Sequence, residues 1–455
     1  MLDDTIAAIS TPVGAGAIGI VRLSGPQALA IAQGLFAGVA TPQSHHAHLG
    51  LIRHPESGQP LDQALLLYMQ APRSFTGEDI VEFHCHGGVH LLRTVLNLCL
   101  QSGARPASPG EFSQRAFLNG KLDLTQAEAI MDLIHSRSDP ALFQASHQLE
   151  GQLSGPIRIL REQLMEALAA IEANIDFPDE VDPVPEAELT HAIGTALTQA
   201  EALLATHQAG RIWKEGLQLA LIGRPNVGKS TLLNGLLRYE RAIVSEIPGT
   251  TRDTVEDDCY LGGIPVRLVD TAGLRQTGDK IEQIGIERSM KALESADLVL
   301  LILDATVGLT DYDRELLTAQ VQPQAQAQKK TIVVWNKIDQ VATPPTLPAE
   351  FDLPQAQVAA LTRQGLEDLE ELLKNEILKN QPLDFKVTIN ERHKLCLARS
   401  QAALGKARET LQSGLPTDFI AIDLKEAIVA FGEMIGAAVH DEVIDRVFHR
   451  FCVGK

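Results

Sequence analysis

The sequence predicts a multidomain chain of mixed α/β and α class. A doubly wound α/β domain is inserted into a discontinuous helical domain, behind an N-terminal α+β domain. Its 455 residues are enough for about three domains. Short apolar runs typical of strands dominate residues 1–120, whereas apolar residues three and four apart dominate residues 121–213 and 381–455. Between these segments, in residues 214–380, strand-like runs alternate with helical patterns, as they do in doubly wound sheets.

The composition excludes several classes of protein. Hydrophobic residues make up 45% of the chain, and no apolar run approaches the roughly 18 residues of a membrane span. The first residues, MLDDTIAAISTPVG, lack the basic region and the long apolar core of a secretory signal. Five scattered cysteines indicate a reducing cytoplasm and no disulfide framework. A net charge of −19 argues against sequence-blind nucleic-acid binding, but it leaves room for a local basic site or for a partner that supplies positive surface.

The N-terminal domain is expected to alternate strands and helices, with polar residues near glycines as candidate ligand contacts. The expected strands are 18–23, 64–69 and 80–84, and the expected helices are 26–36 and 89–101. The polar candidates are Arg22 in GIVRLSG, Glu82 in FTGEDIVEFHCHGG and Lys121 in FLNGKLDL. Each of these charges, taken alone, is more often a solvated side chain than a ligand contact.

Two groups of histidines could be read as metal ligands. His84 and His86 stand two apart in an expected strand and so share one face. Two ligands without two more nearby make a poor zinc site, so a satisfied structural pair is the favoured interpretation. His45, His46 and His48 are expected to lie in a solvated polar loop.

The helical segments are expected to form a scaffold. Residues 157–175 keep apolar side chains at three- and four-residue spacing, which gives one apolar helix face. The acidic, proline-rich stretch 176–188 breaks this helix, and a further helix is expected up to about residue 207. A second apolar stripe lies near the end of the chain at Leu424, Ile428, Phe431 and Ile435. We therefore expect the last helical segment to pack on the helices that precede the nucleotide domain.

A phosphate-binding loop follows the first strand of the inserted domain. The apolar run 217–222 ends at Gly223, and GRPNVGKS at residues 223–230 fits the phosphate-loop pattern at every fixed position. Backbone N–H groups of such a loop and the helix N-terminus beneath it favour a polyphosphate. Lys229 is placed to reach the outer phosphates, and the Ser230 hydroxyl is placed to hold a magnesium ion. The remaining expected strands are 254–261, 266–270, 298–304, 331–335 and 355–359, with a turn at Gly262-Gly263.

Three further signals follow in the order that a GTP site requires. GTTRD at residues 249–253 supplies a threonine pair on a loop that could close over the outer phosphate and magnesium. DTAG at residues 270–273 supplies a magnesium-shell carboxylate and an N–H that senses the outer phosphate. NKID at residues 336–339 follows a strand, and the Asp339 carboxylate can accept two hydrogen bonds from guanine. Adenine presents a different edge, so GTP is preferred over ATP. These motifs resemble those of the translation-factor-related branch of the small GTPases, which usually has a serine where this chain has Ala359. The resemblance implies that the backbone contact to guanine survives without a supporting hydroxyl.

Several residues are candidates for the hydrolytic step. Leu274 stands where a Ras-like enzyme carries its water-orienting glutamine, so another group must act. The downstream acids Asp279, Glu282 and Glu287 are alternatives for this role. Candidate arginine fingers are Arg252 and Arg275. A potassium ion could replace an arginine, and Asn226 of the phosphate loop offers an oxygen ligand for it.

Over essentially its whole length the chain resembles the tRNA modification GTPase family MnmE, also called TrmE. The resemblance is carried by GIVRLSG, SFTGEDIVEFHCHGG, PGEFSQRAFLNGKLDLTQAEAI, IDFPDE, GRPNVGKS, IVSEIPGTTRD, DTAGLR, IEQIGIERS, NKID and the terminal CVGK. These blocks span all three regions in the expected order, which makes the match specific.

The resemblance implies an activity and a set of partners. The family forms a homodimer and a heterotetramer with a flavin (FAD) partner, MnmG. It adds an aminomethyl or carboxymethylaminomethyl group to carbon five of the wobble uridine of certain tRNAs. A tetrahydrofolate derivative, formyl or methylene, supplies the one-carbon unit, and GTP hydrolysis drives a conformational cycle.

The resemblance also implies roles for individual residues. The folate derivative would be bound by Arg22, Glu82, Lys121 and Lys455. Glu282 would orient the attacking water, and Cys452 of the terminal motif would be a functional thiol, although an inert terminal cysteine is the plainer alternative. Magnesium would be held by Ser230 and Thr251, and potassium by Asn226, Ser245, Ile247 and Thr250. The nucleotide and its cations would be contacted by Asn226, Val227, Gly228, Lys229, Ser230, Thr231, Ser245, Glu246, Ile247, Pro248, Gly249, Thr250, Thr251, Asp270, Thr271, Ala272, Gly273, Asn336, Lys337, Asp339, Ala359 and Ala360.

Two other functions remain as alternatives. A ribosome-assembly switch GTPase would share the GTP signals, but the chain lacks a basic RNA-binding tail and its last helical stretch has no G-x-x-G clamp. A potassium-sensing regulatory scaffold would leave the first domain without folate, and folate binding by residues 1–120 would argue against it.

Overall fold

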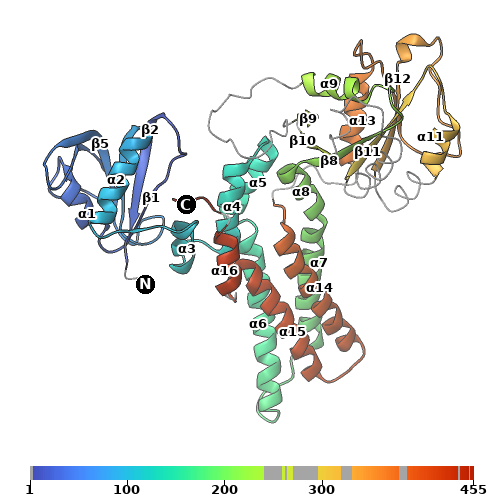
Figure 1. Cartoon of the computed structure of the whole chain (residues 1–455). Coiled ribbons are helices and arrows are strands. Elements are labelled where there is room, and N and C mark those ends of the chain that lie inside the picture. The colour runs from blue at the N-terminus through green and yellow to red at the C-terminus, as the bar shows by residue number, and fades with distance from the viewer. Residues whose placement is uncertain are drawn as a thin grey trace.

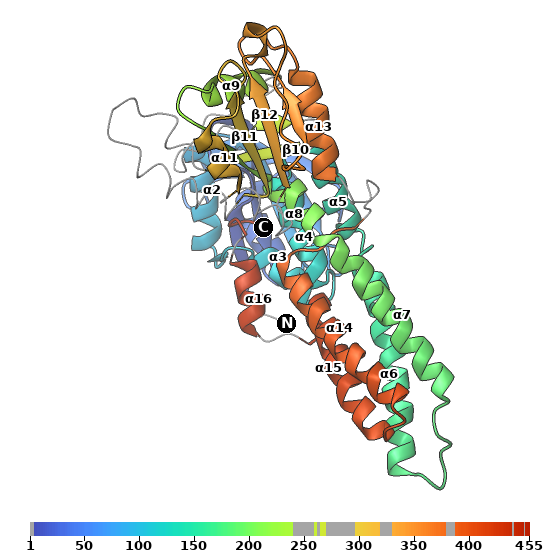
Figure 2. The same cartoon turned by 90° about the vertical axis from the view of Figure 1, so that its right-hand side faces the viewer.

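The computed structural model describes residues 4–239, 259–261, 264–269, 296–318, 330–378, 387–438, 441–449 and 451–455. Figure 1 shows a sheet-containing N-terminal part, a long bundle of helices and a second sheet-containing part. Turned by a quarter, the bundle extends well away from both sheets, with α6, α7, α14 and α15 running side by side (Figure 2). The two sheets and the bundle correspond to the α/β and α classes predicted above.

The N-terminal sheet has seven strands in the order β3-β4-β5-β6-β2-β1-β7. Its strands are β1 Ile6–Ile9, β2 Gly16–Ser24, β3 Phe36–Ala37, β4 Ala47–Arg53, β5 Pro60–Met69, β6 Ile80–Gly87 and β7 Arg105–Pro106. Helices α1 (Ala28–Leu35) and α2 (Val89–Gln101) share one hydrophobic core with the sheet residues that face them, such as Val21, Leu66 and Phe83. The strands predicted at 18–23, 64–69 and 80–84 lie within β2, β5 and β6.

One loop prediction is wrong. His48 lies in β4, opposite Leu66 of β5, so only His45 and His46 precede the strand. The alternation that marks a strand is weak here, because Leu49 is 63% exposed and glycine occupies position 50. The pairing of β4 with β5 decides the conformation where the local pattern does not.

The helical part joins two segments that are far apart in the chain. Its helices are α3 Glu111–Leu118, α4 Leu124–His135, α5 Asp139–Leu149, α6 Ser154–Asp176, α7 Glu186–Ala205, α8 His207–Glu215, α14 Glu391–Gln412, α15 Thr417–Ile435 and α16 Asp441–Phe448. One core cluster contains Leu160 and Leu164 of α6 together with Leu404 of α14 and Leu424 of α15. Burial of each such side chain stabilises the bundle by about 1.5–3 kcal/mol. The predicted packing of the last segment on the earlier helices is confirmed.

A partly buried ion-pair cluster also joins these two segments. The carboxylate of Glu128 on α4 lies 2.7 Å from Nε of Arg392 and 2.7 Å from Nε2 of His393, both at the start of α14. The Asn390 amide donates to the same carboxylate at 3.0 Å, and the Asn390 side chain also caps α14. Arg392 further donates to the backbone oxygens of Glu433 and Met434 at the end of α15.

The nucleotide sheet has six strands in the order β13-β12-β11-β8-β10-β9, all parallel except that β9 runs antiparallel to β10. The strands are β8 Leu217–Ile222, β9 Cys259–Leu261, β10 Ile264–Val269, β11 Leu298–Asp304, β12 Lys330–Asn336 and β13 Gln355–Gln357. The described helices of this part are α9 Lys229–Tyr239, α11 Asp311–Leu316, α13 Leu366–Leu378 and the 3-10 turn Ile338–Gln340. Separate core clusters cover the two faces of the sheet, one with α9 and α13 and the other with α11, so the sheet is doubly wound.

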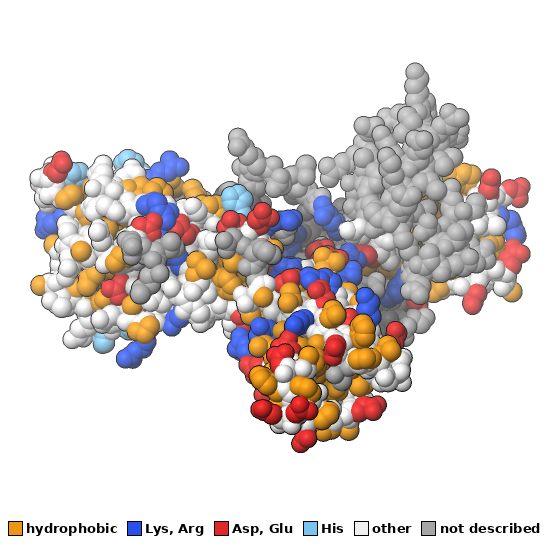
Figure 3. All heavy atoms as spheres, turned by 90° about the horizontal axis from the view of Figure 1, so that it is seen from below, with side chains coloured by type: hydrophobic (Ala, Val, Ile, Leu, Met, Phe, Trp, Pro, Cys, Tyr) orange, Lys and Arg blue, Asp and Glu red, His pale blue; other side chains and the backbone are white. Residues whose placement is uncertain are grey.

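The surface and the helices bear on two classes that the composition argues against, sequence-blind nucleic-acid binders and membrane-spanning proteins. Acidic, basic and apolar side chains are intermixed over the end of the helical bundle in the view from below (Figure 3). That face therefore lacks the single-sign positive surface that loose nucleic-acid binding requires. Among the helices described, none combines the length and the apolar character needed to cross a bilayer.

Candidate functional site

The phosphate loop is built where β8 ends beside β11. Gly223 has φ 151°, and a Cβ at this residue would lie 2.3 Å from the backbone oxygen of Ile302 in β11. Gly228 has φ 97°, and a Cβ there would lie 2.2 Å from the Asn336 amide. Glycine is therefore required at both positions, by the close approach as well as by the backbone conformation. Asn226 adopts a left-handed conformation with φ 64° at the tip of the loop.

Lys229 starts helix α9 and lies over the loop. Its ammonium donates to the backbone oxygens of Gly223 at 2.6 Å and Arg224 at 2.7 Å. Burial lowers the pKa of Lys229 from its ordinary value. Ser230 and Thr231 are exposed in the first turn of α9, where N–H groups and the helix dipole favour anions. The loop thus presents a cation, two hydroxyls and a helix N-terminus to the same side of the sheet.

Asn336 at the end of β12 ties three segments together. Its amide donates to the backbone oxygen of Val227 at 2.8 Å, and its side-chain oxygen accepts from the N–H of Ala360 at 3.0 Å. The side chain is buried, so these two bonds are shielded from water. Asn336 therefore joins the phosphate loop to the 358–361 loop.

The next residue, Lys337, makes a second connection to the phosphate loop. It has φ 67°, and its ammonium donates to the backbone oxygen of Asn226 at 2.9 Å and to Oδ2 of Asp304 at 2.6 Å. Asp339 follows in the 3-10 turn with an exposed side chain. Ala359 is buried and its N–H donates to the backbone oxygen of Gln364, while Ala360 is also buried. The structure thus gathers the described residues of the GTP motifs at the carboxyl edge of one sheet.

Many of the predicted site residues lie outside the described part of the chain. These are Arg252, Arg275, Glu282, Ser245, Glu246, Ile247, Pro248, Gly249, Thr250, Thr251, Asp270, Thr271, Ala272 and Gly273.

A second polar site lies in the N-terminal domain. Arg22 of β2 and Glu82 of β6 are directly opposite in the antiparallel register, and Nε of Arg22 donates to Oε1 of Glu82 at 2.7 Å. The other carboxylate oxygen, Oε2, lies 2.9 Å from Nε2 of His84. The Arg22 guanidinium also lies over the ring of Phe112 at 5.7 Å. Glu82 is buried, and the Arg22 guanidinium supplies the opposite charge that its carboxylate needs there.

The chain's last residues meet this site. The N–H of Gly110 donates to the backbone oxygen of Cys452 at 3.3 Å, and the N–H of Phe112 donates to that of Lys455 at 3.2 Å. Nη1 of Arg22 donates to the backbone oxygen of Gly454 at 3.5 Å. The structure therefore brings Arg22 and Glu82 together with the CVGK tail, and it leaves the side chain of Cys452 exposed.

Lys121 is held elsewhere in the same domain. Its ammonium donates to the backbone oxygen of Pro72 at 2.7 Å, and its side chain lies close to Gly77. These contacts place Lys121 on the 72–77 loop, and none of the contacts described joins it to Arg22.

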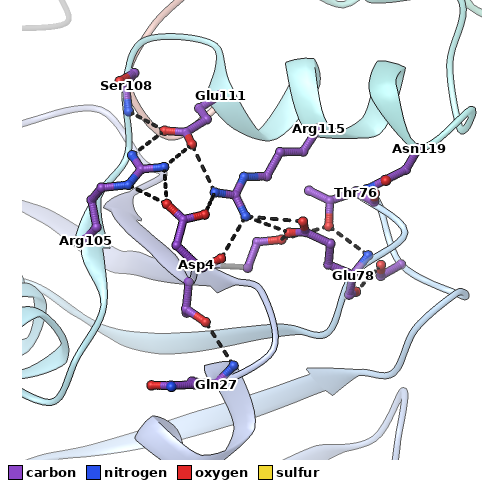
Figure 4. Close-up of polar contacts among 12 residues, drawn as sticks. Asp4, Gln27, Thr76, Glu78, Arg105, Ser108, Glu111, Arg115 and Asn119 are labelled. Atoms are coloured by element: carbon purple, nitrogen blue, oxygen red, sulfur yellow. Dashed lines mark hydrogen bonds and ion pairs between the residues drawn. The ribbon is translucent and has the colours of Figure 1, made fainter. Parts of the chain in front are cut away.

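Sequence reasoning missed a charged cluster that supports this loop (Figure 4). Arg115 on α3 is buried, with its guanidinium 2.7 Å from Asp4, 3.0 Å from Glu111 and 3.1 Å from Glu78. Glu78 directly follows the 72–77 loop, whose Pro72 accepts a hydrogen bond from Lys121. The Glu78 carboxylate also accepts from the Ser24 hydroxyl at 2.7 Å. The only local signal was the charge of Arg115 within an amphipathic helix, which is usually a solvated position.

Each histidine of the pair 84 and 86 has a carboxylate partner. His84 pairs with Glu82, and Nδ1 of His86 lies 2.7 Å from Asp62. Within the described ranges, His, Cys, Asp and Glu do not gather in threes as a metal site would require. These contacts agree with the interpretation as a structural pair, which stays a prediction.

Comparison with known proteins gives two family models and many full-length relatives. The model described as GTP-binding protein TrmE N-terminus matches residues 5–121, and the MnmE helical domain model matches residues 124–452. The chain is similar to the tRNA modification GTPase MnmE of Trichodesmium erythraeum, with 46% identity over 99% of this chain and 98% of that protein. It is also 46% identical to the proteins of the same name from Synechocystis and Moorella thermoacetica, over the full length of both chains in each case.

Solved structures give partial matches. A structure of Aquifex aeolicus Era bound to GDP and AlF4- is 26% identical, covers 41% of this chain and 66% of that chain, and has a TM-score of 0.25. The G domain of the T. maritima FeoB protein is 24% identical, covers 36% and 97% of the two chains, and has a TM-score of 0.23.

Proposed function

The chain belongs to the MnmE family of tRNA modification GTPases, and we propose that it hydrolyses GTP in order to modify the wobble uridine of certain tRNAs. The observation that carries the GTPase assignment is that the phosphate loop is joined to residues 336–339, here called the guanine loop, through Asn336 and Lys337. Hydrolysis adds water to the γ-phosphorus and breaks its bond to the β,γ-bridging oxygen, which releases GDP and phosphate. Lys229 stabilises the negative charge that this step places on the phosphate oxygens.

Guanine selectivity is assigned to Asp339. Its exposed carboxylate has two acceptor oxygens, which match the ring N–H and the amino group of guanine. Asn336 is buried, and both the nitrogen and the oxygen of its side-chain amide are hydrogen-bonded to backbone groups. It therefore shapes the loop and does not read the base. Adenine would leave the Asp339 acceptors unpaired, which is the penalty that excludes ATP.

Magnesium and potassium belong to the same proposal. Ser230 and Thr251 would hold magnesium, and Asn226, Ser245, Ile247 and Thr250 would hold potassium, which neutralises charge on the phosphates when bound. The exposed Ser230 hydroxyl at the start of α9 and the exposed Asn226 amide are oxygen donors of the type that both cations prefer. Glu282 would orient the attacking water, with Arg252 and Arg275 as candidates for charge stabilisation.

The N-terminal polar site is proposed to bind a tetrahydrofolate derivative as one-carbon donor. A buried carboxylate paired with an arginine suits a heterocycle edge that carries N–H donors, and Lys121 and Lys455 suit a charged tail. The exposed Cys452 thiol would stand beside that donor. With the FAD-binding partner MnmG in a heterotetramer, the product would be an aminomethyl or carboxymethylaminomethyl group on carbon five of the uridine.

A homodimer through the N-terminal domain completes the proposal. Helices α1 and α2 cover one face of the seven-stranded sheet, whereas apolar residues stand exposed on the other, with Ile18 at 64%, Leu49 at 63% and Leu65 at 42%. Exposed apolar surface of this kind marks an interaction site. Leu49→Glu should therefore shift the purified protein toward a monomer in light scattering, whereas Val307→Glu, at an exposed position of the nucleotide part, should not.

The decisive experiment is chemical analysis of tRNA from cells that lack the gene. Loss of the wobble-uridine modification, restored by the wild-type chain and not by Lys229→Ala, would support the assignment. A parallel Cys452→Ser chain tests whether the tail thiol is needed. Unchanged nucleosides together with a ribosome-assembly defect would instead support a switch GTPase for ribosome assembly.

A further inference from the structure

We propose that Asp304 is a positioning residue of the GTP site, which acts through Lys337 to hold the phosphate loop and the guanine loop as one unit. This inference rests on the proposed GTPase function and adds a residue that none of the GTP motifs contains. Asp304 is the last residue of β11, a strand whose seven residues are all buried. The strand lies between β8, which leads into the phosphate loop, and β12, which leads into the guanine loop.

The Asp304 carboxylate is fixed on both of its oxygens. Oδ1 accepts from the N–H of Thr306 at 2.9 Å and from its hydroxyl at 2.6 Å. Oδ2 accepts from the Lys337 ammonium at 2.6 Å. Burial opposes the charged form, but the bonds from Lys337 and Thr306 outweigh it, and the pKa of Asp304 lies below its ordinary value. The carboxylate is therefore ionised at neutral pH and forms a charge-assisted bond to Lys337.

Lys337 passes this constraint to the phosphate loop. The same ammonium donates to the backbone oxygen of Asn226 at 2.9 Å. Lys337 and Asn226 both have positive φ, at 67° and 64°, a conformation that other residues than glycine rarely adopt without support from their surroundings. One ammonium thus supports two unfavourable backbone conformations, and Asp304 supplies the charge that keeps it there.

The two connections between the loops are separable. Asp304 and Asn336 are paired in the β11–β12 register, but their side chains bond to different groups. The Asn336 amide holds the backbone oxygen of Val227, whereas Lys337 holds that of Asn226 with the Asp304 carboxylate as its charged partner. Loss of Asp304 should therefore loosen the tip of the phosphate loop but leave its base attached. We expect a defect in nucleotide affinity with intact folding.

An alternative role for Asp304 is purely local. It also closes the turn after β11, since its backbone oxygen accepts from the N–H groups of Val307 and Gly308. Asp304→Asn keeps an acceptor for Thr306 and removes the charge that faces Lys337. Thr306→Val removes the hydroxyl bond to Asp304 and leaves the Lys337 contact in place. The two variants therefore distinguish positioning of Lys337 from closure of the turn.

The test measures GDP affinity, kcat and KM for the full-length protein and its variants, with circular dichroism as the check on folding. Asp304→Asn should weaken GDP binding about tenfold or more, the range of a lost bond to a charged group, and should raise KM more than it lowers kcat. Thr306→Val should change GDP affinity by less than about threefold, because Oδ1 of Asp304 keeps the bond from the Thr306 N–H and Oδ2 keeps the bond from Lys337.

A double-mutant cycle with Lys337→Met decides whether Asp304 acts through Lys337. In the Lys337→Met background, Asp304→Asn should weaken GDP binding by less than about threefold, because the residue through which Asp304 acts is already absent. Equal losses in the two backgrounds, or a folded Asp304→Asn protein with wild-type affinity, would overturn the inference. A wild-type protein that binds no guanine nucleotide would instead refute the proposed function, and this inference with it.

Discussion

Removal of the Glu128 carboxylate should destabilise the helical part more than any single surface charge. Glu128 lies between Arg392 and His393, and Arg392 also binds two backbone oxygens at the end of α15. In Glu128→Gln the partly buried guanidinium of Arg392 remains without a counter-charge. Breaking a buried pair from one side costs about 3–5 kcal/mol, because the remaining charge is desolvated and unpaired.

The expected change in melting temperature follows from the size of the unit. For a helical unit of about 150–250 residues, each kcal/mol corresponds to roughly 2–4 °C, so the transition should fall by about 6–20 °C. The measurement is the helical circular-dichroism signal during heating. The matched control is Glu172→Gln on α6, which removes an exposed pair, 2.6 Å from Lys425. Such a pair contributes at most about 1 kcal/mol.

The same carboxylate predicts a dependence of stability on pH. Burial favours the neutral form of Glu128, but the charges of His393 and Arg392 outweigh it and hold its pKa well below the ordinary value. A carboxyl whose pKa is lowered by folding stabilises the protein above its unfolded pKa and loses that contribution as pH falls toward the folded pKa. The difference in the free energy of unfolding between wild type and Glu128→Gln should therefore have its full value at pH 7 and decrease below about pH 4. A Glu128→Gln transition no lower than that of Glu172→Gln at pH 7 would refute this reasoning.

Three other predictions concern the nucleotide site. Gly228→Ala should reduce GDP affinity at least about tenfold, because φ is 97° and the new Cβ would lie 2.2 Å from the Asn336 amide. Gly34→Ala in α1, where a Cβ meets nothing within 4 Å, is its control in the same fluorescent-nucleotide titration. Asp339→Asn should shift preference from GTP toward xanthosine triphosphate, and unchanged selectivity in competition binding would discredit the base-reading assignment. Glu282→Ala should retain GTP affinity and lose hydrolysis in a phosphate-release assay, and normal turnover would transfer the water-orienting role to another acid.

Local sequence was sufficient for the phosphate loop and for the apolar face of α6. The phosphate loop at 223–230 could be predicted because its strand, glycine turn and helix start are contiguous, and the helical stripe on α6 because its period repeats along one helix. The resemblance to the MnmE family rests on such blocks in their order along the chain. Strand β4 could not be predicted from local sequence, since its conformation depends on pairing with β5.

Contacts between distant segments required the tertiary structure. Arg22 and Gly454 are separated by 432 residues, and Glu128 and Arg392 by 264, so no local pattern relates the members of either pair. Asp304 has a recognisable place at the end of a buried strand, yet its partner lies 33 residues away on the neighbouring strand's loop. The sequence by itself determined the chemistry of the phosphate loop and the class of the elements that have a strong local pattern, because these depend on side chains within a few turns of one another. Only the tertiary structure decided which charges meet, because burial and ion pairing depend on distances in space that the order of residues does not contain.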